Sequence, residues 1–312
     1  MQNSEQANRR ALTVEVTDAE AGQRLDNFLL ARCSGVPKSH IYRIIRSGEV
    51  RVNSGRVKPK VRVQSGDKVR IPPIRLKPQG PVTVPQALAD ALANSVIYEH
   101  RDFLVVNKPA GLAVHKGSGL VFGAIDGLRQ GLAQPQLELV HRIDRGTSGA
   151  LVVARDRGIC RSMQALFRDH EVKKDYLALV AGRWAENSQT INLALLKNVE
   201  TAGERRVVVD PKGKPAVSHF LVKQRFDLAT LMAVSIETGR THQIRVHAAS
   251  AGHPVVGDTR YGQNATNTAF RQTGLERLYL HASELSFQWS GETHSIQAPV
   301  DSGWTSALAS LA

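Results

Sequence analysis

The sequence predicts an α+β fold in two domains, a small basic N-terminal domain and a large domain with a mainly antiparallel mixed sheet. Its 312 residues are enough for two domains, and a hydrophobic content of 42% is ample for packed cores. In the larger part, strand-like segments do not alternate regularly with helical ones, which argues against a doubly wound parallel sheet. Three prolines in the segment PQGPVTVP are typical of a semi-rigid linker. We therefore expect a disordered N-terminus at residues 1–11, the small domain at 12–77, the linker at 78–85 and the large domain at 86–312.

The small domain is predicted to contain two helices and several short strands. Residues 24–30 have apolar side chains at helical spacing, and a second helix is expected from Pro37, which suits a first helical position, to Gly48. One face of this second helix is apolar and the opposite face is polar and basic. The apolar face comprises Ile41, Ile44 and Ile45, and the polar face comprises Ser39, Arg43 and Arg46. Alternating segments at 49–53, 56–57, 61–63 and 68–71 are expected to form short strands.

Positive charge is concentrated in this small domain. The chain carries a formal charge of +13, and between Arg32 and Lys77 thirteen basic residues face two acidic ones, a local charge of +11. A concentrated positive field indicates a polyanionic partner. Membrane surfaces also attract basic patches, but these residues alternate with strand-like ones and do not line an amphipathic helix with aromatic anchors, so we favour nucleic acid. The candidate RNA-binding residues are Lys38, Arg43, Arg46, Arg51, Lys58 and Lys60.

The large domain is predicted to be mainly strands with several helices. Residues 96–98 and 103–107 are expected to form a hairpin, which ends where Pro109 and Gly111 interrupt the strand pattern. Further expected elements are a helix at 159–169, strands at 172–180 and 231–237, and a helix at 241–250.

One carboxylate in the large domain is flanked by cations. Asp144 lies in the segment HRIDRGTSG, residues 141–149, between strand-like segments at 136–140 and 150–154. Arg142 and Arg145, as near neighbours, would keep the carboxyl ionised by lowering its pKa. An ionised Asp at a glycine-containing loop can act as a nucleophile or general base. Taken alone, a structural ion pair is the more common role for such a residue.

Other function classes find little support. No apolar stretch approaches the ~18 residues needed to span a bilayer, and the polar N-terminus has no export signal, so we expect a cytoplasmic protein with no membrane partner. Cys33 and Cys160 form no paired-cysteine motif. His242 and His247 are separated in angle on a helix and lack further ligands, so no metal site is predicted.

Several motifs in order along the chain resemble the RluA superfamily of pseudouridine synthases. The segment HRIDRGTSG resembles the central motif of this family, with Ile143 in place of leucine. Residues 107–111 (NKPAG) with His115, 174–178 (KDYLA), 237–247 (ETGRTHQIRVH), 253–258 (HPVVGD), 261–262 (YG) and 280–282 (LHA) resemble its other motifs. Residues 24–71 resemble the alpha-L RNA-binding domain first described in a small-subunit ribosomal protein, and their details are most similar to the RluC branch.

The resemblance implies isomerisation of uridine to pseudouridine in RNA without a cofactor. It implies that Asp144 attacks the sugar or acts as a base, that Arg245 pairs with this carboxylate, and that Tyr176 stacks on the base and removes the C5 proton. Arg142 matches the position that fills or guides the site of the flipped nucleotide. His141 and Lys108 are expected to have structural roles.

The expected substrate is 23S ribosomal RNA, alone or in a precursor of the large ribosomal subunit, and the expected state is a monomer. Transfer RNA stays open as a substrate, and a non-catalytic RNA-binding or ribosome-assembly factor is the competing class. An RNA methyltransferase is not favoured, because no glycine-rich loop follows a predicted strand with an acidic residue about 20 positions on.

Overall fold

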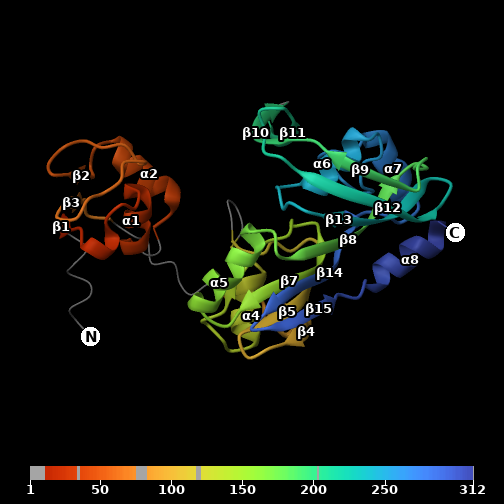
Figure 1. The fold of residues 1–312 in the computed structure, drawn as a ribbon, viewed down its shortest axis with the longest axis horizontal. Coiled ribbons are helices and arrows are strands. Elements are labelled where there is room, and N and C mark those ends of the chain that lie inside the picture. Colours follow the sequence, from red (N-terminus) through yellow and green to blue (C-terminus); the bar gives the residue numbers. More distant parts are fainter. Residues whose placement is uncertain (1–10, 34–35, 75–82, 117–120, 202–203, 312) are drawn as a thin grey trace. The chain divides into compact units, whose positions relative to one another are not determined.

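The computed structural model of the chain describes residues 11–33, 36–74, 83–116, 121–201 and 204–311 (Figure 1). The chain divides into two compact units, Met1–Val82 and Thr83–Ala312, so the division falls inside the proline-rich segment 78–85. Residues 1–10, which we predict to be disordered, and most of the predicted linker lie outside the described residues.

The first unit packs two helices against a small antiparallel sheet. Its elements are β1 (Leu12–Glu15), a 3-10 turn η2 (Asp18–Glu20), α1 (Leu25–Arg32), α2 (Lys38–Arg46), β2 (Arg51–Val52) and β3 (Lys68–Ile71), with the strand order β1-β3-β2. The predicted apolar face of α2 is confirmed, since Ile41, Ile44 and Ile45 are all buried in the core.

Two strands predicted in this unit are absent from the described residues. The segments 56–57 and 61–63 form no strand. Val61 instead accepts from the N–H of Leu25, the first residue of α1, at 2.8 Å, and Val63 accepts from Gly22 N–H at 2.8 Å and donates to the Gln23 carbonyl at 3.0 Å. The alternating pattern at 61–63 therefore belongs to a loop that packs against the beginning of α1. Val63 is buried there although it is not part of a strand.

The second unit is built around a ten-stranded mixed sheet. In chain order its elements are α3 (Gln86–Ala93), β4 (Val96–Glu99), β5 (Phe103–Lys108), α4 (Ala124–Gly131), β6 (Glu138–Leu139), β7 (Ser148–Ala154), α5 (Arg157–Arg168), β8 (Lys173–Ala181), β9 (Ser188–Asn192), β10 (Leu195–Thr201), β11 (Glu204–Val209), β12 (Val217–Arg225), β13 (Ala229–Ile236), α6 (Gln243–Ser250), α7 (Asn264–Gln272), β14 (Leu280–Trp289), β15 (Glu292–Gln297) and α8 (Ser302–Leu311). The strand order is β4-β5-β7-β14-β8-β13-β12-β9, with β15 beside β14 and β6 beside β7, while β10 and β11 form a separate hairpin. Neighbouring strands are antiparallel except β7 and β14, which confirms the predicted mainly antiparallel mixed sheet.

Most elements predicted in this unit are confirmed with small shifts. The hairpin of β4 and β5, the helix α5 and the strands β8 and β13 lie where the sequence indicates. The segment 136–140 forms only the two-residue strand β6. The helix α6 begins at Gln243 instead of residue 241, because His242 has a left-handed backbone with φ of 55° that cannot belong to the helix.

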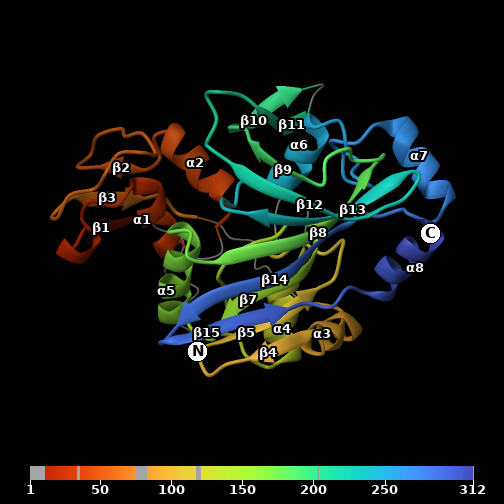
Figure 2. The same cartoon turned by 45° about the vertical axis from the view of Figure 1, so that its right-hand side comes forward.

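The strand β14 joins the two halves of this sheet (Figure 2). Ala282 of β14 pairs with Gly149 of β7 on one side and with Tyr176 of β8 on the other. Gly149 has φ of 109°, and a Cβ there would lie 2.2 Å from the Ala282 carbonyl oxygen, so only glycine allows this approach. The start of β7 and Tyr176 are thereby brought to opposite edges of one strand.

No helix within the described residues is long and apolar enough to cross a membrane.

Candidate active site

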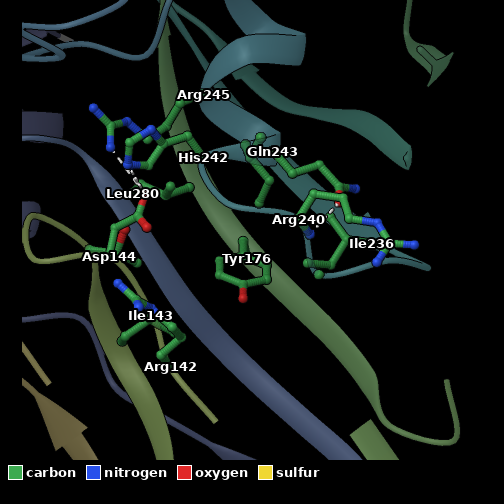
Figure 3. Close-up of a pocket in the computed structure, with 13 residues that line it drawn as sticks. Arg142, Ile143, Asp144, Tyr176, Ile236, Arg240, His242, Gln243, Arg245 and Leu280 are labelled. Atoms are coloured by element: carbon green, nitrogen blue, oxygen red, sulfur yellow. Dashed lines mark hydrogen bonds and ion pairs between the residues drawn. The ribbon is translucent and has the colours of Figure 1, made fainter. Parts of the chain in front are cut away.

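Asp144 lies at the edge of a pocket in the second unit (Figure 3). It occupies the loop between β6 and β7, where its carbonyl accepts a bond of 3.1 Å from Thr147 N–H. Its side chain is 19% exposed, so the carboxylate is screened from bulk water but open to the pocket. Other elements that line the pocket are β8, with Tyr176, and the segment from the end of β13 into α6, with Arg240 and His242.

The cation that contacts Asp144 is Arg245 of α6. Its Nη1 donates to Asp144 Oδ2 at 3.0 Å. The other side of the same guanidinium is held by Asp258, with Nε donating to Oδ2 at 2.7 Å and Nη2 donating to Oδ1 at 2.9 Å. The side chains of Arg245 and Asp258 are only 11% and 0% exposed. One buried guanidinium therefore bridges two carboxylates, which fixes its plane and directs one N–H at Asp144.

Asp258 is itself fixed by backbone donors. Its Oδ1 accepts from the amides of Arg260 at 2.9 Å and Tyr261 at 3.1 Å. Burial acts to raise the pKa of Asp258, but the hydrogen bonds and charge of Arg245 and these two amides outweigh it, so the pKa is lowered overall. The carboxylate thus stays charged and anchors Arg245.

Arg142 and Arg145, the near neighbours expected to keep Asp144 ionised, do not supply the ion pair that the structure shows for it. Arg145 is exposed and its Nε donates to the carbonyl of Gly111 at 2.8 Å. Arg142 is exposed and lines the pocket. The ion pair that the structure shows for Asp144 is made by Arg245, 101 residues later in the chain. Adjacent residues of an irregular loop point in different directions, so sequence proximity is a poor guide to pairing here.

His242 and Tyr261 lie beside this ion pair, His242 next to Asp144 and the Tyr261 ring next to Arg245. The Tyr261 hydroxyl accepts from Val207 N–H at 3.2 Å and lies 2.7 Å from His242 Nδ1. His242 Nε2 lies 3.8 Å from Asp144 Oδ2. Burial lowers the pKa of His242 to about 4, so the imidazole is neutral near pH 7. If the Tyr261 proton is donated to Nδ1, the His242 proton resides on Nε2 and faces Asp144.

Tyr176 faces the same pocket from β8. Burial and then the charge of Asp144 raise the pKa of its phenol above the ordinary value of 10. Tyr176 is therefore protonated at neutral pH and presents a flat aromatic surface beside the carboxylate.

Comparisons with known proteins agree with this geometry. A family model described as RNA pseudouridylate synthase matches residues 102–250, and a model described as S4 domain matches residues 23–69. The chain is 49% identical over 303 residues to the ribosomal large subunit pseudouridine synthase C of Yersinia pestis, covering 96% of this chain and 95% of that protein. The corresponding protein of Escherichia coli K12 is 48% identical over 305 residues, covering 96% of each. The chain belongs to the RNA pseudouridylate synthase family.

Within this family the chain lies in the RluC branch of the RluA superfamily and carries an N-terminal S4 domain, as predicted. It is therefore an RNA pseudouridine synthase, which confirms the predicted class of enzyme. The solved structure of human RNA pseudouridylate synthase domain containing 1 is similar, with a TM-score of 0.58 and 31% identity over 66% of this chain and 83% of that one. Human RNA pseudouridylate synthase domain containing 4 shares the fold, with a TM-score of 0.61 at 24% identity, over 72% of this chain and 96% of that one.

Buried Lys108 and partly buried His141 lie next to the Asp144 loop of this synthase. Lys108 of β5 is 0% exposed, and its Nζ donates to the carbonyls of Pro109, Leu112 and Arg145 at 2.7, 2.8 and 3.3 Å. Burial lowers the pKa of Lys108 to about 7. His141 accepts from Val152 N–H at 3.0 Å and stacks on Phe167, while burial lowers its pKa to about 3. These contacts fit the structural roles expected for both residues.

His242, which precedes α6, and His247 of α6 point to different partners. His247 is buried, with Nδ1 3.0 Å from Ser218 Oγ and Nε2 3.1 Å from the Leu193 carbonyl, whereas His242 faces Asp144. Among the residues that the structure describes, no group of three His, Cys, Asp or Glu side chains could hold a metal ion.

The candidate RNA-binding residues lie on the surface of the S4 domain. Lys38, Arg43, Arg46, Lys58 and Lys60 are exposed and Arg51 is partly exposed. Arg43 lies 3.6 Å from Glu49, and Arg51 Nε donates to the Gly48 carbonyl at 2.8 Å. Exposure leaves these charges available to an anionic partner, and their role in binding RNA stays a prediction.

Asp258 and Tyr261 belong to motifs of the family resemblance, but the sequence predicted no role for them. For His242 the sequence predicted only that it does not form a metal site with His247. The motif match was the one signal for them, because their contacts to Arg245 and to each other cross irregular turns whose geometry no local pattern predicts.

Proposed function

We propose that this enzyme converts specific uridines of 23S, large-subunit ribosomal RNA to pseudouridine, with Asp144 as the reacting group. The observation that carries the proposal is the ion pair of Asp144 with Arg245 in a pocket that also contains Tyr176. Arg245 donates to Asp144 Oδ2 at 3.0 Å, which orients the carboxylate in the pocket for attack on a sugar or removal of a proton.

The two oxygens of Asp144 have different surroundings. Oδ2 accepts from Arg245 and faces Nε2 of His242 at 3.8 Å (Figure 3). We therefore assign the reacting role to Oδ1. In the reaction the bond from uracil N1 to ribose C1′ breaks and a bond from C5 to C1′ forms, while a proton leaves C5 and one is gained at N1. Atoms and electrons balance within the substrate, so no cofactor is needed.

Tyr176 and Arg142 would bind and position the uracil base of the flipped nucleotide. The raised pKa of Tyr176 keeps the phenol protonated, which favours stacking on the uracil. To take the C5 proton, the phenol would first have to lose its own proton. Arg142 is exposed and lines the pocket, which supports a role in filling or guiding the position of a flipped nucleotide.

The substrate proposal is supported by the S4 domain and by the relatives. The local charge of +11 suits a folded polyanion, and the similar proteins of Yersinia pestis and Escherichia coli are named as ribosomal large subunit pseudouridine synthases. We further propose that the enzyme acts in the cytoplasm as a monomer.

The test is a pseudouridine map of ribosomal and transfer RNA from cells that lack the protein, complemented with the parent or with Asp144→Asn. We expect positions in large-subunit RNA to lose the modification, to regain it with the parent and not with the variant. Asp144→Asn keeps its shape, so its RNA affinity should stay within a few-fold of the parent's. Asp169→Asn, an exposed Asp on the surface, is the matched control and should restore the modification. Lost positions only in transfer RNA would overturn the substrate proposal, and full activity of Asp144→Asn would overturn the role of Asp144.

A further inference from the structure

A basic groove lies beside the active-site pocket, between the hairpin of β10 and β11 and the turn that leads into α6. It has a volume of about 400 Å³. Among the described residues that line it, every ionisable side chain is a cation and none is aromatic. The cations are Lys197, Lys212, Lys214 and Arg240.

Backbone contacts hold the lysines of this groove in place. The chain folds back after β11, so that Leu195 and Lys214 exchange two backbone hydrogen bonds of 2.9 Å each. A Cβ at Gly213 would lie 2.3 Å from the carbonyl carbon of Leu195, so only glycine allows this turn to pack onto β10. Asp210 closes the turn by accepting from the amide of Lys212 at 2.7 Å. These contacts fix the backbone positions of Lys212 and Lys214 beside β10, and so determine where their exposed ammonium groups can reach.

The groove is tied to the catalytic machinery. Val246, next to Arg245 on α6, packs in one cluster with Leu195 of β10 and Val207 of β11. Gly239 and Arg240 line both the groove and the pocket of Asp144. Arg240 is held by a bond of 3.0 Å from Nε to the Pro215 carbonyl, and its guanidinium extends away from Asp144 (Figure 3).

We propose that this groove binds the phosphodiester backbone of the RNA strand next to the flipped uridine. The inference rests on the proposed function for the identity of the strand. Lysine ammonium groups act as point charges for phosphate, and a lining without aromatic rings or acidic groups suits backbone contact better than stacking of bases. Because Arg240 belongs to both sites, a strand whose base enters the pocket continues directly into the groove.

The experiment removes two of these charges and compares the loss with an equal loss elsewhere. Lys212→Gln/Lys214→Gln is placed in the full chain carrying Asp144→Asn, so that binding is measured without turnover. Arg161→Gln/Arg271→Gln is the control, because it removes two exposed charges, on α5 and α7. The affinity for an unmodified large-subunit RNA transcript is measured over a series of salt concentrations. Each phosphate contact contributes about −0.7 to −0.9 to the slope of log K against log salt, so the groove variant should show a slope shallower by about 1.4 to 1.8. The control should change the slope by less than half of that.

The same pair of variants is then tested with Asp144 intact. We expect the groove variant to lose kcat/KM on the transcript, mainly through KM, and the control to retain it. A groove variant with the salt slope and kcat/KM of the control would overturn the groove proposal while leaving the proposed function standing. Absence of pseudouridine formation by the parent would overturn the proposed function instead, and the binding series would still decide whether the groove holds RNA.

Discussion

Asp258 offers a test of how the site is held together, because it is buried, contacts Arg245 and does not line the pocket of Asp144. In Asp258→Asn the amide oxygen can replace Oδ1, which accepts from Arg245 Nη2 and from the amides of Arg260 and Tyr261. The amide nitrogen then replaces Oδ2 and faces Arg245 Nε, so two donors meet where a bond of 2.7 Å was made. One buried charge pair is broken, and both side chains are nearly inaccessible to water.

We expect this substitution to lower the free energy of unfolding of the second unit by about 3 to 5 kcal/mol, the usual cost of removing one partner of a buried ion pair. Since Trp184, Trp289 and Trp304 all lie in this unit, tryptophan fluorescence during urea unfolding reports on it alone. Arg245 also loses its orientation toward Asp144, so kcat should fall on the order of 10²-fold. The affinity for RNA should be unchanged, because Asp258 is inaccessible.

Asp301→Asn is the matched control for this prediction. Asp301 makes the same two-bond contact with Arg277, at 2.7 and 2.8 Å, but its side chain is 43% exposed. Its loss should cost about 1 kcal/mol and leave kcat unchanged. Equal effects of the two substitutions on the free energy of unfolding and on kcat would refute the reasoning. The buried contact of Asp258 with Arg245 would then contribute no more to stability or to kcat than an exposed ion pair.

Three further predictions concern cofactors, the S4 domain and pH. Activity should survive exhaustive chelation and need no added nucleotide, which assays of dialysed enzyme on folded RNA would check; recovery only with zinc or magnesium would contradict it. Removing residues 1–82 should leave a folded second unit that binds ribosomal RNA more weakly and with a shallower salt slope, and an unchanged slope would show that the S4 domain is not the docking surface. Burial lowers the pKa of His141 from 6.5 to about 3, so between these pH values the unfolded chain binds a proton at His141 that the folded chain does not bind. The contribution of His141 to the free energy of unfolding is therefore fully present above about pH 6.5. It decreases as the pH falls, by about 2 kcal/mol at pH 5. His141→Gln, which can still accept from Val152, should remove that part of the pH dependence in urea unfolding, and an unaltered profile would exclude His141 as its source.

Local patterns predicted those parts of the molecule that local forces determine. The spacing of Ile41, Ile44 and Ile45 predicted the buried face of α2, and the turn between residues 98 and 103 predicted the hairpin of β4 and β5. The left-handed backbone of His242 could not be predicted, because non-glycine residues adopt it when tertiary contacts compensate, here the contact of His242 with Tyr261.

The candidate site was predictable only in part for the same reason. The motif singled out Asp144 as the candidate reactive carboxylate, but the expectation that Arg142 and Arg145 act on it assumed that neighbours in sequence are neighbours in space. Arg245 followed from the family resemblance alone, and the position of Asp258 beneath it has no local signature. Contacts between residues over a hundred positions apart depend on the order of strands in the sheet, which periodicity does not encode.

The order of strands also explains why the site depends on the last part of the chain. Asp144 precedes β7, whereas Tyr176 lies on β8 and Arg245 follows β13, and β14 is inserted between β7 and β8. The strands β7 and β8 are therefore connected in the sheet only by way of β14, in which Ala282 pairs with Gly149 of β7 and with Tyr176 of β8. The carboxylate belongs to one half of the sheet, and its cation and aromatic partner belong to the other. The distance of 3.0 Å between Asp144 and Arg245 consequently depends on the completed sheet, in which β14 is the strand that joins the half carrying Asp144 to the half carrying Arg245.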